Sequence, residues 1–184
     1  MIRHLIAASV SGRAWVNAAR ELFGTLSATG LPTGVIVART VATPYTTNAD
    51  LSTAIPADDT VPMDSEGTQI LTVAHAMQAP TNRLVIRFQG WGSGGDASQL
   101  AAALISSTAT LAIAAHGVKS QASDNPILFG LTHEYSSGAT TSVTYSIRVG
   151  PQTAGAAMRM NGITSTRRFG GVSAFTLVIE EVKA

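Results

Sequence analysis

The middle of the chain alternates between apolar and polar positions. Two runs, residues 69–77 and 83–88, have the composition of strands and are joined by a turn at residues 79–82. In the second run, the alternate residues Leu84, Ile86 and Phe88 are apolar. The positions between them include Arg83 and Arg87. This pattern predicts a sheet with one wetted face, because a strand buried on both faces would not hold two unpaired arginines.

Similar short runs recur along the rest of the chain. Further strands are expected at residues 35–41, 100–105, 110–118, 126–135, 141–149, 157–160 and 173–183. Alanine in 100–105 and 110–118 would also suit a helix, but the Ser-Thr turn between them favours two strands. Turns at 136–138 and at Asn161-Gly162 predict hairpins. About eight or nine short strands at regular spacing predict an antiparallel β-sandwich, and among sandwiches a jelly roll.

A polar segment punctuated by prolines, residues 45–67, separates the first strand from the second. Such a composition limits continuous strand pairing. The segment nevertheless contains large aliphatic side chains that can act as anchors: Leu51, Ile55, Val61 and Met63. We therefore expect an ordered crossing segment that these side chains anchor to the sandwich.

The N-terminal residues form a separate unit in this interpretation. Trp15, Leu22, Phe23 and Leu26 recur at helical spacing and predict a short amphipathic helix. An isolated helix of this length is marginal in water, so it should dock on a larger assembly or on the rest of the chain, or serve as an export signal or membrane anchor. Its apolar run is too short to span a bilayer. We divide the chain into an arm at 1–40, with the four residues as anchoring positions, and a head at 41–184.

The overall composition narrows the classes of function. The chain has 184 residues, 45% of them hydrophobic and 12% charged, a formal net charge of +1 and no cysteine. A near-neutral chain without a basic cluster is not steered toward nucleic acid. Without cysteine, the chain has neither disulfides nor thiolate metal sites. So few charges on the surface indicate that neighbouring subunits cover part of it.

One short motif is typical of an enzyme class. Residues 90–95 fit the dinucleotide-binding pattern G-x-G-x-x-G and follow a strand. A dinucleotide site also needs an acidic residue about 20 positions further on, to hold the ribose hydroxyls. Residues 114–118 contain none. We therefore expect a glycine-rich connection between strands and no cofactor.

Other candidate chemistry is weaker. The four histidines, His4, His75, His116 and His133, have no metal-binding spacing. The carboxylates of residues 58–66 could gather around a calcium ion, but they lack the spacing of a calcium loop and are expected to be solvated. His133 and Glu134 are adjacent on a strand, so they point to opposite faces and cannot form a catalytic relay with Ser136. We find no catalytic set and no metal site, and expect a protein without enzymatic activity.

Three residues are candidates for binding. Trp91 lies between glycines, and packing in the core or between subunits is the expected role of its ring; the alternative is a loop tip, where an exposed ring would contact a sugar or a protein. Tyr135 and Asn161 are expected on loops as well. None of the three is tied to a particular ligand by the sequence.

Three parts of the chain form a recognisable set: residues 44–51 with 55–62, residues 66–73 with 79–87, and residues 168–182. Together they resemble a domain found in tail-fibre, spike and head-fibre proteins of tailed bacteriophages and prophages. The resemblance covers residues 43–184. It implies a trimeric β-jelly-roll, similar in shape to the heads of C1q and tumour necrosis factor, that is carried by a virion and assembled in the bacterial cytoplasm.

These observations favour a non-enzymatic structural protein of a phage-like virion. The arm would attach to other capsid or tail proteins, and the homotrimeric head would be exposed, with host-surface attachment as a further expected role. A carbohydrate-binding adhesion module is the alternative, with a glycan as the partner. A nucleotide-dependent enzyme that uses residues 90–95 is the third hypothesis.

Overall fold

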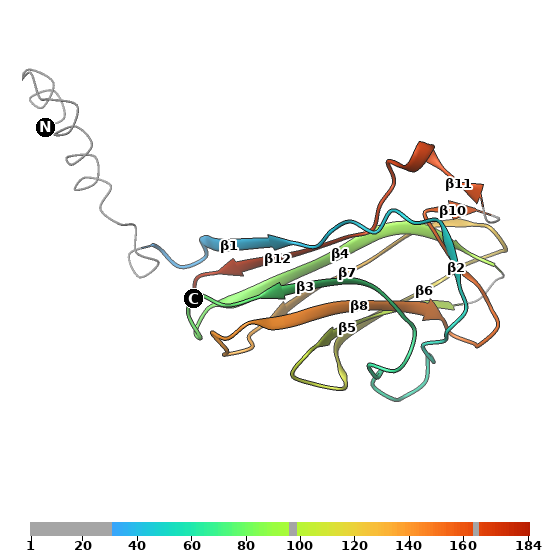
Figure 1. The fold of residues 1–184 in the computed structure, drawn as a ribbon. Helices are drawn as coiled ribbons and strands as arrows, with labels where there is room; N and C mark the ends of the chain where they lie inside the picture. Colours follow the sequence, from blue (N-terminus) through green and yellow to red (C-terminus); the bar gives the residue numbers. More distant parts are fainter. Residues whose placement is uncertain (1–30, 96–98, 164–165) are drawn as a thin grey trace, which may run out of the picture.

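The computed structural model describes residues 31–95, 99–163 and 166–184. In these ranges, two antiparallel sheets face each other (Figure 1). The first sheet contains β1 (Ile36–Val41), β12 (Thr176–Val182), β4 (Arg83–Gly94) and β7 (Pro126–Tyr135), with the short β9 (Met158–Met160) and β2 (Ala49–Leu51) beside the far end of β4. The second sheet contains β3 (Thr68–His75), β8 (Val143–Pro151), β5 (Gln99–Ser106) and β6 (Ala112–Lys119). A small hairpin, β10 (Gly162–Ile163) and β11 (Thr166–Arg167), precedes the turn η3 (Phe169–Gly171).

The order of the strands is that of a jelly roll. The long strands of the first sheet have the order β1-β12-β4-β7, and those of the second sheet have the order β3-β8-β5-β6. If these eight long strands of the described ranges are numbered from one to eight along the chain, the two orders are 1-8-3-6 and 2-7-4-5. Every pairing between neighbouring strands in these sheets is antiparallel. Two interleaved Greek keys give this order. The predicted fold class, an antiparallel β-sandwich of jelly-roll type, is confirmed.

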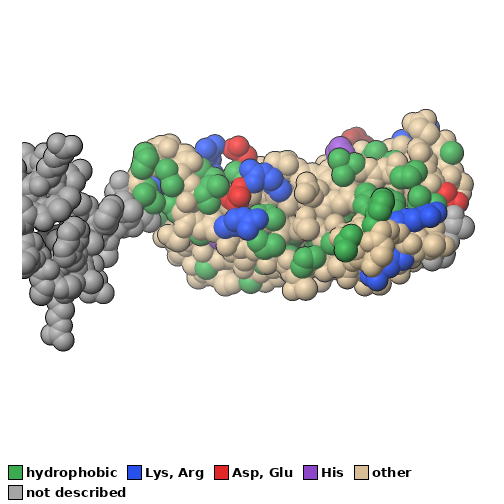
Figure 2. All heavy atoms as spheres, turned by 90° about the horizontal axis from the view of Figure 1, so that it is seen from above, with side chains coloured by type: hydrophobic (Ala, Val, Ile, Leu, Met, Phe, Trp, Pro, Cys, Tyr) green, Lys and Arg blue, Asp and Glu red, His purple; other side chains and the backbone are tan. Residues whose placement is uncertain are grey.

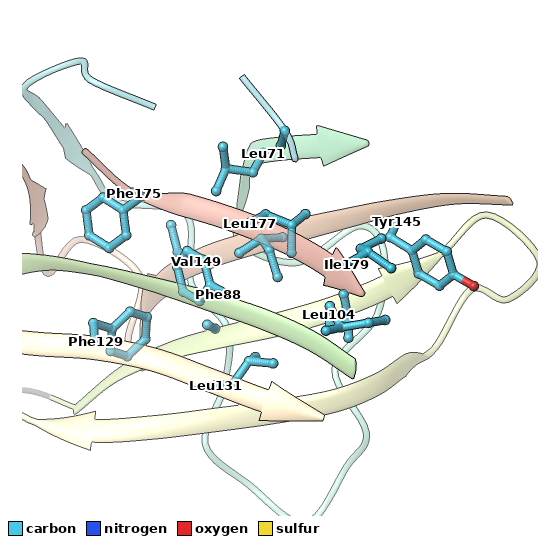
Figure 3. Packing of buried hydrophobic residues seen from close by; sticks show 14 of the residues in the cluster. Leu71, Phe88, Leu104, Phe129, Leu131, Tyr145, Val149, Phe175, Leu177 and Ile179 are labelled. Atoms are coloured by element: carbon cyan, nitrogen blue, oxygen red, sulfur yellow. The ribbon is translucent and has the colours of Figure 1, made fainter. Parts of the chain in front are cut away.

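The core lies between the two sheets (Figure 3). The alternation in β4 has the predicted effect, because Leu84, Ile86 and Phe88 are at most 2% exposed. Phe88 stacks on Phe175 with the ring centroids 5.6 Å apart and meets Phe129 edge-on at 6.0 Å. Each large apolar side chain buried in this way stabilises the fold by about 1.5–3 kcal/mol. The first sheet is therefore held on the second by alternate residues of its strands.

The alanine-rich runs form strands β5 and β6, as predicted. β5 is buried on both faces, since Ala101 and Ala103 pack against Ile55 of the crossing segment. Small side chains on the outer face leave room for this second layer. Of the four expected anchors, Ile55 is fully buried and Leu51 packs against the core. Val61 and Met63 are 52% and 45% exposed, so the prediction is wrong for these two.

The two predicted hairpins do not form. β7 pairs with β4 in the first sheet and β8 pairs with β3 and β5 in the second, so the turn at 136–138 carries the chain between the sheets. Asn161-Gly162 joins β9 to β10, and β10 pairs with β11 instead. Alternation predicts that a strand has one buried face, but two strands joined by a turn show the same alternation whether they pair side by side or face each other.

The expected helix and its anchoring positions Trp15, Leu22, Phe23 and Leu26 lie outside the described residues, so the arm stays a prediction. β1 pairs with β12 from Ile36 onward, so residues 36–40 belong to the first sheet, although the division at residue 41 assigned them to the arm. No helix in the described ranges is long and apolar enough to cross a membrane.

Candidate binding surface

The glycine-rich run is part of a strand, which corrects the expectation of a connection between strands. β4 continues through Gly94. A Cβ atom at Gly90 would lie 2.1 Å from Cδ1 of Phe175, and one at Gly92 would lie 2.2 Å from the carbonyl oxygen of Arg159. Glycine is needed at both positions because an aromatic ring and the backbone of β9 approach closely. The motif has a packing explanation, and its residues do not form the turn into a helix that a dinucleotide site requires.

Trp91 lies on the outer face of β4, so the alternative that placed it at a loop tip is wrong. It is opposite Leu128 of β7, and the ring of Phe169 meets its indole edge-on, with the centroids 5.4 Å apart. Leu128 is 80% exposed and Phe169 is 69% exposed, whereas Trp91 is half-buried. The indole Nε1 of Trp91 is buried and has no hydrogen-bond partner among the described residues. Trp91, Leu128 and Phe169 together form what we call the apolar patch.

The turn that carries Phe169 has an unusual backbone. Phe169 has a φ angle of 53°, and Gly170 and Gly171 follow at 60° and 91°. The left-handed region is unfavourable for a bulky side chain, and strain of this kind costs about 1–3 kcal/mol. The backbone N–H of Val172 donates to the carbonyl of Phe169 at 3.1 Å and closes the turn. A strained backbone thus presents an aromatic ring to solvent above the indole.

Asn161 lies in the bend between β9 and β10, so it is on a loop as expected, but it is buried and supports this turn from beneath. It is 1% exposed and adopts a φ of 54°. Its side-chain Nδ2 donates to the carbonyls of Tyr45 and Thr47 at 3.0 and 3.1 Å, and its Oδ1 accepts from Ser173 at 3.1 Å. Asn161 therefore ties the segment after β1 to the segment before β12.

Tyr135 is also on a strand and not on a loop. It is the last residue of β7, half-buried, and its ring meets Tyr145 edge-on with centroids 6.3 Å apart. At about 3.3 Å per residue, it lies roughly 23 Å along β7 from Leu128. The structure therefore does not bring Tyr135 together with Trp91.

The charged residues of the first sheet's outer face are paired with one another. Arg83 Nη1 lies 2.9 Å from a carboxylate oxygen of Glu134, and Glu180 pairs with both Arg87 and Arg39. Figure 2 shows this face, with charged side chains in separate groups and hydrophobic side chains between and around them. These pairs neutralise the two cations of the alternating run and lie toward the start of β4. The apolar patch lies toward its other end.

Two carboxylates of the crossing segment, those of Asp58 and Glu66, are engaged in local turns. Hydrogen bonds from the side chain and the backbone of Thr60 hold the pKa of Asp58 below its ordinary value. Glu66 accepts from the backbone N–H of Met63 at 2.9 Å. In the described part of the chain, no three His, Asp or Glu side chains are grouped so that they could hold a metal ion.

The chain matches no protein-family model and no curated protein. Among solved structures, it is similar to the crystal structure of the CBM36-1 domain of a multidomain xylanase from the hindgut metagenome of Trinervitermes trinervoides. The two chains are 7% identical, the match covers 77% of this chain and 96% of that chain, and the TM-score is 0.36. A TM-score this low supports no argument about this chain.

Sequence reasoning missed Leu128 and Phe169. For Leu128, a signal was present, because in the run 126–135 it shares the outward register with Gly130, Thr132 and Glu134, where a leucine is out of place. Phe169 had no comparable signal, since its exposure depends on a turn that alternation does not describe.

Proposed function

We propose that this protein is a non-enzymatic structural component of a phage-like virion, with a jelly-roll head that assembles as a homotrimer. The observation that carries the proposal is the apolar patch on the outer face of the first sheet. The outer face of an antiparallel sheet is polar when it faces water, and a contiguous apolar area on it marks an interface. A second copy of the chain is the occupant we propose for this surface.

Three further features support this assignment. Residues 43–184 resemble virion fibre and head-fibre domains, for which a trimeric jelly roll is expected. Only 12% of the residues are charged, which suits a surface partly covered by neighbouring copies. The chain enters β1 at Ile36, beside Val182, whereas the apolar patch lies toward the other end of β4. The residues before β1 therefore leave the head at the end away from the patch, where they would attach the trimer to a capsid or tail protein.

The oligomeric mass tests the assembly. Light scattering should give three times the chain mass for the full chain. Leu128→Ser combined with Phe169→Ser should give monomers that remain folded, because both side chains are exposed in the single chain. Leu111→Ser is the matched control, since Leu111 is 46% exposed at the second sheet and should leave the trimer intact. A monomeric full chain, or a trimer that survives the double substitution, would contradict the proposal.

The location in a particle needs its own measurement. Phage-like particles purified from the source bacterium after induction should contain this chain when their proteins are identified by mass spectrometry. Its absence from purified particles, with the chain present in the cell extract, would refute the virion assignment while leaving the trimer untouched.

A second function, carbohydrate binding for attachment to a host surface, is favoured by a polar cleft on the outer face of the second sheet. Trp91 is poorly suited to it, because the half-buried indole is met by Phe169 and is not an open platform. The two functions are compatible, since they use different sheets. The third hypothesis, a nucleotide-dependent enzyme, loses its support because Gly90 and Gly92 serve close packing within a strand.

A further inference from the structure

A cleft of about 810 Å³ opens on the outer face of the second sheet. Its floor is made by outward side chains of two paired strands, Gln69 and Thr72 of β3 and Thr144, Ser146 and Arg148 of β8. Gln69 is paired in register with Arg148, and Thr72 with Ser146, so these groups form adjacent rows across the sheet. The volume is within the range of about 300–1,000 Å³ that small-molecule sites occupy.

The wall of the cleft is built by two segments that are joined through their backbones. The loop after β5, residues 107–111, lies beside the turn that contains Asp64. The N–H of Asp64 donates to the carbonyl of Thr110 at 2.8 Å, and that of Ala112 donates to the carbonyl of Pro62 at 2.8 Å. Arg148 fixes the same turn by donating to the carbonyl oxygens at residues 66 and 67, at 2.5 and 2.9 Å. The cleft is therefore preformed, and a ligand would not have to order its wall.

The lining is rich in hydrogen-bonding groups that have no role in the fold. Within the described ranges, the side chains of Gln69, Thr72, Thr144 and Ser146 make no hydrogen bond to another residue, and neither does the carboxylate of Asp64. Hydroxyl and amide groups both donate and accept, and a carboxylate accepts only. Such a set matches a ligand that itself carries many hydroxyl groups.

We infer that this cleft binds a saccharide. A phosphate or another compact anion is disfavoured, because the single arginine shares the cleft with Asp64. A single-stranded nucleic acid would need aromatic side chains for stacking, and a protein partner would need aromatic or large apolar anchors at the centre. Among the described residues that line the cleft, none is aromatic, and of the larger apolar ones Ile105 is buried and Leu111 belongs to the wall loop. A hydroxyl-rich ligand is the class that the remaining groups recognise.

The inference rests on the second proposed function, carbohydrate binding, and does not depend on the virion assignment or on the trimer. The cleft is on the second sheet, and the apolar patch is on the first. Light scattering on the same samples distinguishes the two proposals. A variant that loses sugar binding but keeps the mass of the trimer tests the cleft alone and leaves the assembly proposal unchanged.

The test is titration of the full chain with xylo-, malto- and chito-oligosaccharides and with O-polysaccharide from bacterial lipopolysaccharide. Saturation-transfer NMR detects weak binding, and calorimetry measures its affinity. We expect at least one of these probes to bind at millimolar concentration. The double substitution Thr72→Val and Thr144→Val keeps the shape and the strand propensity and removes two hydroxyls, so it should weaken binding roughly tenfold or more.

Thr132→Val is the matched control, since Thr132 is an exposed threonine on β7 of the other sheet. It should leave the affinity unchanged. Two outcomes would overturn the inference: no binding of any of these saccharides at millimolar concentration, or binding that the double substitution leaves as strong as in the natural chain.

Discussion

The carboxylate of Glu181 is expected to be among the most important single polar groups for stability. It is completely buried, and it accepts hydrogen bonds from the backbone N–H of Gln78 at 2.9 Å, the N–H of Ala79 at 3.3 Å and Nδ2 of Asn82 at 2.5 Å. His75 is also buried, and its Nε2 lies 3.4 Å from Oε2 of Glu181. One side chain of β12 therefore holds the turn between β3 and β4, the point where the chain passes from the second sheet to the first.

Glu181→Ala would leave these donors without their acceptor. A buried donor that loses its partner costs about 1–3 kcal/mol, and breaking a buried charged network costs about 3–5 kcal/mol. Water can reach Gln78, which is exposed, so we expect a loss of about 4 kcal/mol rather than the full sum. That is a large part of the roughly 5–15 kcal/mol by which a domain is stable. Glu181→Gln keeps one acceptor oxygen and should cost about half as much.

The neighbouring Glu180 provides the control. It is on the same strand and points to the opposite face, where it pairs with Arg39 and Arg87, whose side chains are 57% and 51% exposed. Glu180 itself is 13% exposed, but its two arginines reach solvent, and pairs at the surface contribute about 0–1 kcal/mol, so Glu180→Ala should cost much less than Glu181→Ala. Urea unfolding followed by far-ultraviolet circular dichroism measures both variants. Equal losses for Glu180→Ala and Glu181→Ala would refute the reasoning.

Two further predictions concern single atoms in the core. Gly92→Ala should lower stability by about 3 kcal/mol in urea unfolding, because the new Cβ would lie 2.2 Å from a backbone oxygen of β9 that cannot yield cheaply; a loss below about 0.5 kcal/mol would contradict the close approach of β4 and β9. Tyr145→Phe should change stability by no more than about 1 kcal/mol, because the phenol oxygen is buried and Ser137, the hydroxyl near it, does not make a well-formed hydrogen bond to it. Burial raises the pKa of Tyr145, so the unfolded chain ionises first and stability should fall as the pH rises above about 10. This fall should be shallower in Tyr145→Phe, and parallel pH profiles would argue against it.

Periodicity in the sequence was sufficient to predict the eight long strands and the fold class, but not the short strands β2, β10 and β11 or the glycine-rich end of β4. Alternate apolar residues mark which face of a strand is buried, as at Leu84, Ile86 and Phe88, and a run of such strands leaves few architectures. The pairing partners were not predictable, because alternation is the same for a hairpin and for a crossing between sheets. The strand at 126–135 was predicted with its observed bounds, yet its turn to β8 was assigned to a hairpin.

The candidate surfaces depend on information that one sequence does not carry. Glu180 and Glu181 are chemically identical neighbours, and only the register of β12 between β1 and β4 makes one a surface residue and the other a buried acceptor. Trp91 was singled out because glycines flank it, but those glycines are needed for Phe175 and β9, not for a loop. The cleft could not be predicted, since its walls come from segments about 45 residues apart that meet only through the bonds near Asp64 and Thr110.

The pairing of the start of β1 with the end of β12 also determines how the head would respond to force. Gly34 donates a hydrogen bond to the carbonyl of Lys183 at 2.8 Å, and Ile36 is paired with Val182 (Figure 1). In an antiparallel pair, the hydrogen bonds run perpendicular to the strands. A tension applied between the two ends would therefore load these bonds one at a time and peel β1 from β12 at low force, starting at Gly34. If a partner instead held the face of the sheet while β1 was pulled along its own direction, several hydrogen bonds between β1 and β12 would be loaded at once, in shear. The mechanical strength of the head therefore depends on where a partner binds it.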